Sequence, residues 1–156
     1  MATGYVKLAI CYLVRWLLDW DEARLFISPA IEDWSVLADY QIDTIIDLEG
    51  GLDSGVPTVP NRCLYIYFPI FDEDLPSIEK LDAVVRLGAS LVASGHRVLS
   101  HCGMGFNRSA LIAGLILREL GASGPDAVAR LRERRPGALF NDTFAEYVTS
   151  RGDYAS

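Results

Sequence analysis

The feature that most constrains the fold of this chain is one short stretch, residues 98–113, which has the sequence VLSHCGMGFNRSALIA. Its apolar start predicts a strand, a glycine-rich turn follows, and from Ser109 onward the pattern predicts a helix. Such a turn gathers several backbone N–H groups into a small bowl, and the helix N-terminus adds partial positive charge. The stretch therefore predicts a strand–loop–helix unit that can hold an anion of the size of phosphate.

The rest of the chain alternates apolar runs with amphipathic stretches, a pattern typical of strands and helices around a parallel sheet. We therefore expect an α/β fold with a central, mostly parallel sheet of four to five strands and helices on both faces. The expected strands are residues 24–27, 44–48, 64–68 and 97–100. The expected helices are residues 31–40, 78–93, 109–120, 125–134 and 142–151, three of which begin at a capping residue or a proline, namely Ser77, Pro125 and Asn141.

Length and composition limit the kinds of protein that this chain can be. Its 156 residues, 51% of them hydrophobic, suit one globular domain with a real core and not a disordered chain. The net charge of −7 argues against a nucleic-acid partner and, less strongly, against polyanionic substrates and anionic membranes. The cysteines, Cys11, Cys63 and Cys102, form no paired spacing and no zinc pattern with the two histidines. We therefore expect reduced thiols, a cytoplasmic location and no metal site.

Residues 1–22 are expected to form an apolar N-terminal arm or helix, and residues 23–156 a single domain on which the arm packs. The run from residue 6 to residue 20 is strongly apolar, but Lys7, Arg15 and Asp19 interrupt it. It is also too short for a comfortable membrane span. Contact with a second copy of the chain or with a membrane surface is the alternative, because an apolar face can serve either.

Several residues of the glycine-rich turn carry reactive or anion-binding groups. Cys102 precedes the predicted helix, where the helix dipole and a nearby arginine favour the nucleophilic thiolate. Arg108 offers a planar fork that can hold two phosphate oxygens, and Gly103 and Gly105 permit the positive φ angles that the bowl requires. Ser109 places a hydroxyl close to the sulfur, where it can stabilise the departing thiolate. The pattern predicts attack by Cys102 on a phosphate ester that Arg108 holds.

The residues H-C-x-x-G-x-x-R-S after a Val-Leu strand resemble the signature of the protein tyrosine phosphatase superfamily, and most closely its small dual-specificity branch. The resemblance spans residues 24–147. It implies a cysteine-dependent phosphatase domain that works through a phosphocysteine intermediate, with no cofactor or metal. It also implies that His101 tunes the cysteine through hydrogen bonds and that the loop binds the substrate phosphate. The loop residues are Gly103, Met104, Gly105, Phe106, Asn107 and Arg108.

An acidic segment upstream resembles the mobile loop that carries the general acid in the same family. Asp72 follows Phe68-Pro69 in an aromatic-Pro-x-x-Asp pattern, which implies that Asp72 protonates the leaving oxygen. Asp74, which lies nearer to Pro76, is the competing candidate.

A third segment, residues 135–144 with the sequence RPGALFNDTF, resembles the family's R-P-x-x-x-x-N-x-x-F stretch. In the family this Asn braces the catalytic loop, which implies a supporting role for Asn141 beside that of a plain helix cap. The chain departs from the family at Tyr147, where relatives often carry Gln.

The resemblance implies a phosphoprotein substrate carrying phosphotyrosine and also phosphoserine or phosphothreonine, because the additional loop with which large tyrosine-specific relatives deepen the pocket has no counterpart in this short sequence. Phosphoinositide-cleaving members of the family carry lysine between the cysteine and the arginine, and the five residues between Cys102 and Arg108 include none, so the resemblance disfavours polyphosphoinositides. Three other functions stay open: a phosphatase for a lipid or small-molecule monophosphate, a catalytically weak phosphate-binding module, and a redox or arsenate-reducing protein. The last requires a resolving cysteine, and neither Cys11 nor Cys63 lies beside the loop in the sequence. The oligomeric state is not predicted.

Overall fold

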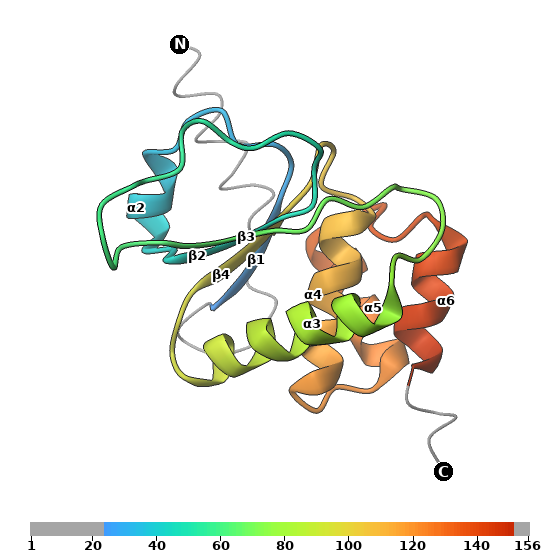
Figure 1. The fold of residues 1–156 in the computed structure, drawn as a ribbon. Coiled ribbons are helices and arrows are strands. Elements are labelled where there is room, and N and C mark those ends of the chain that lie inside the picture. The colour runs from blue at the N-terminus through green and yellow to red at the C-terminus, as the bar shows by residue number, and fades with distance from the viewer. Residues whose placement is uncertain (1–23, 152–156) are drawn as a thin grey trace.

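The computed structural model describes residues 24–151, and at its centre is a parallel sheet of four strands (Figure 1). The strands are β1 (Leu25–Ser28), β2 (Thr44–Asp47), β3 (Leu64–Tyr67) and β4 (Val98–His101). They lie in the order β1-β4-β2-β3, so β4 is flanked by β1 and β2. Ser28 and Asp47 are the register partners of His101, so the carboxyl ends of these three strands meet at one edge of the sheet.

Among the described residues, five helices cover the two faces of the sheet. They are α2 (Val36–Tyr40), α3 (Ile78–Ala93), α4 (Arg108–Glu119), α5 (Gly124–Arg134) and α6 (Asp142–Ser150). α2 lies on one face, where Leu37 packs with Phe26, Ile45 and Leu99 of the sheet. The other four helices lie together on the opposite face and build the larger core (Figure 1). The expected α/β fold, with a parallel sheet and helices on both faces, is confirmed.

The larger core is centred on α4, the helix that follows the glycine-rich loop. Every residue of α4 from Ser109 to Leu117 is buried, because α3, α5, α6 and the sheet all contact this helix. Leu111, Ile112 and Leu115 are fully buried, and burial of a side chain of this size contributes about 1.5–3 kcal/mol relative to its exposure. This packing fixes the N-terminus of α4 and therefore the position of the loop before it.

Three of the helices, α3, α5 and α6, begin at capping residues that the sequence contains. Ser77, Ser123 and Asn141 each accept a hydrogen bond from the backbone N–H three residues further on, at 3.4, 3.2 and 3.2 Å. The bounds of α3, α4 and α6 agree with the expected ones to within one residue. Because Ser123 provides the cap, α5 begins at Gly124, one residue earlier than expected, and Pro125 lies in its first turn.

The first expected helix is shorter than predicted. The pattern of residues 31–40 predicts one helix, but α2 covers only Val36–Tyr40. The Asp33 carboxylate accepts hydrogen bonds from the backbone N–H and the hydroxyl of Ser35, at 3.0 and 2.6 Å. Such a local turn competes with helical backbone hydrogen bonds. Ile31 is instead buried in the small core beside the sheet.

The apolar arm expected at residues 1–22 lies outside the described residues. Between residues 24 and 151, no helix is both long and apolar enough to cross a membrane.

Candidate active site

The sulfur of Cys102 lies at the base of the 102–108 loop, where β4 ends and α4 begins. Gly105 N–H donates a hydrogen bond to Sγ at 3.3 Å, and Ser109 Oγ lies 3.4 Å from Sγ. Cys102 N–H in turn donates to the carbonyl of Ser28 at 3.4 Å. The side chain is buried in the core cluster. A thiolate here would have two hydrogen-bond donors and the N-terminus of a helix to stabilise it.

Gly105 shows why the loop needs glycine. Its φ angle is 72°, and a Cβ at this position would lie 2.7 Å from the backbone nitrogen of Pro29. Ala30 N–H also donates to the carbonyl of Gly103 at 3.2 Å. The turn after β1 therefore lies directly against the loop and limits the shapes that the loop can adopt.

Arg108 is held by three acceptors from two neighbouring loops. Nη2 donates to Glu49 Oε2 at 3.0 Å, and Nη1 lies 3.5 Å from the carbonyl oxygen of Leu48 and 3.3 Å from that of Ile70. The remaining Nε–H is buried and has no hydrogen-bond partner among the described residues. The guanidinium is thus oriented by the protein, while one edge of its fork is left for an oxyanion.

A cavity of about 460 Å³ reaches this guanidinium. Its wall is formed by Tyr67, Pro69, Ile70 and Phe71, and Glu49 and Arg108 supply its charged groups. Two large apolar side chains near this end of the sheet are strongly exposed, Phe71 at 83% and Met104 of the loop at 69%. The entrance beside Arg108 is therefore bordered by apolar surface.

Asp72, Asn107 and Asn141, which are far apart in the sequence, come together beside the loop. The Asn107 side chain donates to one Asp72 carboxylate oxygen at 2.9 Å, and the Asn141 side chain donates to the other at 3.1 Å. Asn141 N–H donates to Asn107 Oδ1 at 2.9 Å, while Asn141 Nδ2 also donates to the carbonyl of Glu73 at 3.1 Å. Asn141 therefore links the acidic segment to the 102–108 loop. Asp74 is exposed two residues further along.

The outer side of the loop is covered by residues that sequence reasoning did not assign to the site. The guanidinium of Arg135 lies 3.8 Å from the ring centroid of Phe106 and donates to the carbonyls of Gly105 and Met104, at 3.4 and 3.3 Å. Leu139 N–H donates to the carbonyl of Phe106 at 2.9 Å. Arg135 and Leu139 thus support the loop by donating hydrogen bonds to its backbone carbonyls, in addition to the contacts of Asn141.

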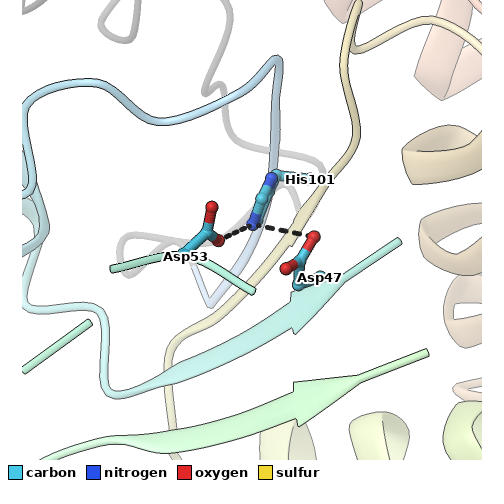
Figure 2. Close-up of side chains that lie close together, drawn as sticks. All are labelled: Asp47, Asp53 and His101. Carbon is cyan, nitrogen blue, oxygen red and sulfur yellow. Dashed lines mark hydrogen bonds and ion pairs between the residues drawn. The ribbon is translucent and has the colours of Figure 1, made fainter. Parts of the chain in front are cut away.

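His101 is buried and faces acidic groups rather than Cys102. Its Nε2 lies 3.0 Å from Asp53 Oδ2 and 3.5 Å from Asp47 Oδ1. Figure 2 shows that this nitrogen faces both carboxylates. The hydroxyl of Tyr65 donates to the other carboxylate oxygen of Asp47. The expected hydrogen bonds of His101 to the cysteine are not found among the described residues; the ring is bonded to these carboxylates instead. One feature of the sequence could have indicated these acidic partners of His101, namely the aspartate that ends the buried strand TIID.

In the described part of the chain, Asp47, Asp53 and His101 lie close enough together to coordinate a metal ion. One ligand atom from each of Asp47, Asp53 and His101 lies within 4.8 Å of the others. Asp53, however, is hydrogen-bonded to the His101 ring at 3.0 Å, and Asp47 accepts hydrogen bonds from Glu49 N–H at 2.9 Å and from the hydroxyl of Tyr65. These hydrogen bonds account for the cluster as a polar network.

Residues 23–122 match the family model described as Tc-R-P, a polymorphic toxin system DSP-PTPase phosphatase. Human DUSP28 is 22% identical, with a TM-score of 0.71 over 88% of this chain and 90% of that one. The human tyrosine phosphatase-like serine/threonine/tyrosine-interacting protein is 22% identical, with a TM-score of 0.69 over 86% and 92%. The Yvh1 phosphatase domain from Chaetomium thermophilum is 25% identical, with a TM-score of 0.64 over 84% and 90%.

The solved structures show that the chain shares the fold of these proteins. The family match covers well over half of the chain, and it includes the 102–108 loop with Cys102 and Arg108. The chain therefore belongs to the DSP-PTPase phosphatase family of polymorphic toxin systems and is a cysteine-dependent phosphatase.

Proposed function

We propose that this phosphatase hydrolyses phosphotyrosine and also phosphoserine or phosphothreonine in proteins, through a phosphocysteine intermediate. The observation that carries the proposal is the joint placement of Cys102 and Arg108 on one loop, with Asp72 tied to that loop through Asn107 at 2.9 Å. A nucleophile, an oxyanion-binding fork and a proton donor are the three groups that such a reaction needs.

In the first step the Cys102 thiolate attacks phosphorus, so that an S–P bond forms while the P–O bond to the leaving group breaks. Asp72 gives its proton to the departing oxygen. Arg108 and the N–H groups of the loop hold the remaining phosphate oxygens as negative charge redistributes over them.

In the second step water attacks the phosphocysteine, and the S–P bond breaks. Asp72, which is now a carboxylate, takes the proton from this water. The hydroxyl of Ser109, whose Oγ lies 3.4 Å from Sγ, can donate a hydrogen bond to the thiolate that leaves. The products are inorganic phosphate and the starting thiolate, so the cycle needs no metal or redox partner. Because a free thiolate must stay reduced, we place the activity in the cytoplasm.

The apolar wall of the cavity supports two substrate classes. Tyr67, Pro69 and Phe71 suit the ring of phosphotyrosine, which is why a phosphoprotein is our first choice. The strong exposure of Phe71 and Met104 favours a lipid or small-molecule monophosphate as the second candidate. The description of the family further supports a role within a polymorphic toxin system.

The alternative of a redox or arsenate-reducing protein loses support from the position of Cys63. Cys63 precedes β3, whereas Cys102 follows β4, and the strands are parallel. The two residues thus lie near opposite ends of four-residue strands, which span about 13 Å. A disulfide requires Cα atoms about 4.4–6.8 Å apart. Cys63 is therefore badly placed as a resolving cysteine, and Cys11 lies outside the described residues.

We further propose that residues 23–156 form the catalytic domain and that residues 1–22 are an arm that packs on it. Deletion of residues 1–22 tests this boundary, because a separate arm can be removed without loss of p-nitrophenyl phosphate turnover. Loss of folding in the truncated protein would place the arm inside the domain.

The experiment that tests the reaction combines trapping with a substrate panel. Acid quenching during turnover of p-nitrophenyl phosphate should leave one phosphoryl group on the Cys102 peptide, detected by mass spectrometry. Cys102→Ser should abolish turnover while tungstate still binds. Turnover by that variant, or an unmodified Cys102 under rapid turnover, would refute the mechanism. Comparison of phosphotyrosine peptide, phosphothreonine peptide and phosphatidate vesicles then decides between the two substrate classes.

A further inference from the structure

The network around His101 determines which ring nitrogen carries a hydrogen. Carboxylates accept hydrogen bonds, so Nε2, which faces Asp47 and Asp53, must be a donor. The other nitrogen, Nδ1, lies on the far side of the ring from the two carboxylates (Figure 2) and has no hydrogen-bond partner among the described residues. The polar contacts of this buried ring among the described residues therefore come from the two aspartates.

Tyr65 closes the network from the neighbouring strand β3. Its hydroxyl donates to Asp47, accepts a hydrogen bond from Asp53 N–H at 3.3 Å, and lies 3.5 Å from Asp53 Oδ2. Burial, together with the hydrogen bond to Asp47, raises the pKa of Tyr65 far above its ordinary value. The hydroxyl thus remains a proton donor. Burial also raises the pKa of Asp53, against the opposing attraction of His101.

The segment that holds His101 also holds the far end of the loop. Glu49 and the carbonyl of Leu48 bind Arg108, while Asp47 and Asp53 bind His101. Residues 47–53 therefore contact both residues that flank the reactive part of the loop. Leu48 N–H adds a hydrogen bond to the carbonyl of His101 at 3.0 Å, which fixes the end of β4.

We propose that Asp53, with Asp47 and Tyr65, is a positioning residue for catalysis. These side chains fix the His101 ring and the adjoining backbone, so that Cys102 Sγ stays within reach of its own hydrogen-bond donors. The donors are Gly105 N–H and the hydroxyl of Ser109, at 3.3 and 3.4 Å. The inference rests on the proposed phosphatase function, in which the Cys102 thiolate is the nucleophile.

Asp53→Asn in the full chain tests the inference without any phosphate ester. The rate at which iodoacetamide alkylates the Cys102 peptide is measured by mass spectrometry across pH. If Asp53 positions the ring, its loss loosens the hydrogen bonds to the thiolate, and the midpoint of the alkylation profile moves to higher pH. Loss of a nearby negative charge without any positioning effect would move the midpoint to lower pH. The two explanations thus predict opposite signs.

The same variant is expected to lower kcat for p-nitrophenyl phosphate by about fivefold to tenfold, because a charge-assisted hydrogen bond becomes a neutral one. KM should change less, since Arg108 keeps its own contacts. Tyr65→Phe, which removes only the hydroxyl, should act in the same direction with a smaller effect. If a thermal melt shows that Asp53→Asn is poorly folded, Tyr65→Phe replaces it as the test variant.

Asp43→Asn is the matched control. Asp43 also pairs with a histidine, His96, at 2.9 Å, but it precedes β2 at the opposite end of the sheet and is half-buried. Its alkylation profile and kcat should match those of the unmodified protein. An unchanged profile in Asp53→Asn, or a shift to lower pH, overturns the positioning role. If the unmodified protein fails to turn over aryl phosphates while the profile still shifts upward, only the proposed function fails.

Discussion

The carboxylate of Glu49 lies 3.0 Å from Nη2 of Arg108 and forms an ion pair with it. A Cβ on Gly103 would lie only 2.7 Å from the same carboxylate oxygen, so Glu49 lies directly against the loop. The other terminal nitrogen of Arg108, Nη1, donates to the carbonyls of Leu48 and Ile70. The guanidinium is therefore oriented before any phosphate arrives, which is how a preorganised oxyanion site lowers the cost of reorganisation.

We expect Glu49→Gln to lower kcat/KM for p-nitrophenyl phosphate by about fivefold, because a neutral hydrogen bond to Arg108 replaces a charge-assisted one. The Kd of tungstate for the Cys102→Ser protein should weaken by a similar factor. Asp126→Asn, which removes the exposed ion pair with Arg130 at 3.0 Å, is the control and should change neither quantity. A tighter Kd in Glu49→Gln would mean that the carboxylate competes with phosphate.

Asp72→Asn should lower kcat by about 10²–10⁴-fold, because the leaving oxygen loses its proton donor. The loss should be larger for phenyl phosphate than for p-nitrophenyl phosphate, whose leaving group needs the proton less. Asp74→Asn is the matched variant, and its kcat values for both esters should stay within twofold of the original, roughly the range of a surface change. The reverse ranking of the two variants would assign the general acid to Asp74.

Asn141→Ala should reduce both stability and activity. It removes the cap of α6, which costs about 1 kcal/mol of unfolding free energy. It also removes the bond from Asn141 to Asp72, so kcat should fall further than stability alone explains. Ser123→Ala removes the equivalent cap of α5 and serves as the control, with a similar loss in urea unfolding and full kcat. Equal kcat in the two variants would limit Asn141 to its capping role.

Gly105→Ala should abolish turnover. The positive φ angle alone costs an alanine about 1–2 kcal/mol, and the new Cβ would also meet Pro29 backbone at 2.7 Å. The loop must shift to relieve this contact, which moves Gly105 N–H away from Cys102 Sγ. Gly121→Ala separates the two effects, because Gly121 has a φ of 110° in open space. That variant should lose stability in a thermal melt and keep its kcat.

Much of the fold follows from local signals. The caps at Ser77 and Asn141 and the strand–loop–helix unit around Cys102 depend on residues a few positions apart, so they could be predicted from the sequence. The failure at residues 31–40 has a local cause as well, since the Asp33 side chain bonds Ser35 in a turn and the helix begins only at Val36. The order of the strands is different, because no local pattern specifies that β4 lies between β1 and β2.

The sequence by itself determined the reactive loop, since Cys102, Gly105 and Arg108 act through backbone geometry within one turn. Only the tertiary structure decided what holds that loop. Asp53 lies 48 residues from His101, and Glu49 lies 59 residues from Arg108, yet each pair bonds at 3.0 Å. The parallel register brings the ends of β2 and β4 together, and burial then requires each polar side chain there to find a partner. Such pairings depend on the packed sheet, so no fixed spacing between the two partners in the sequence predicts them.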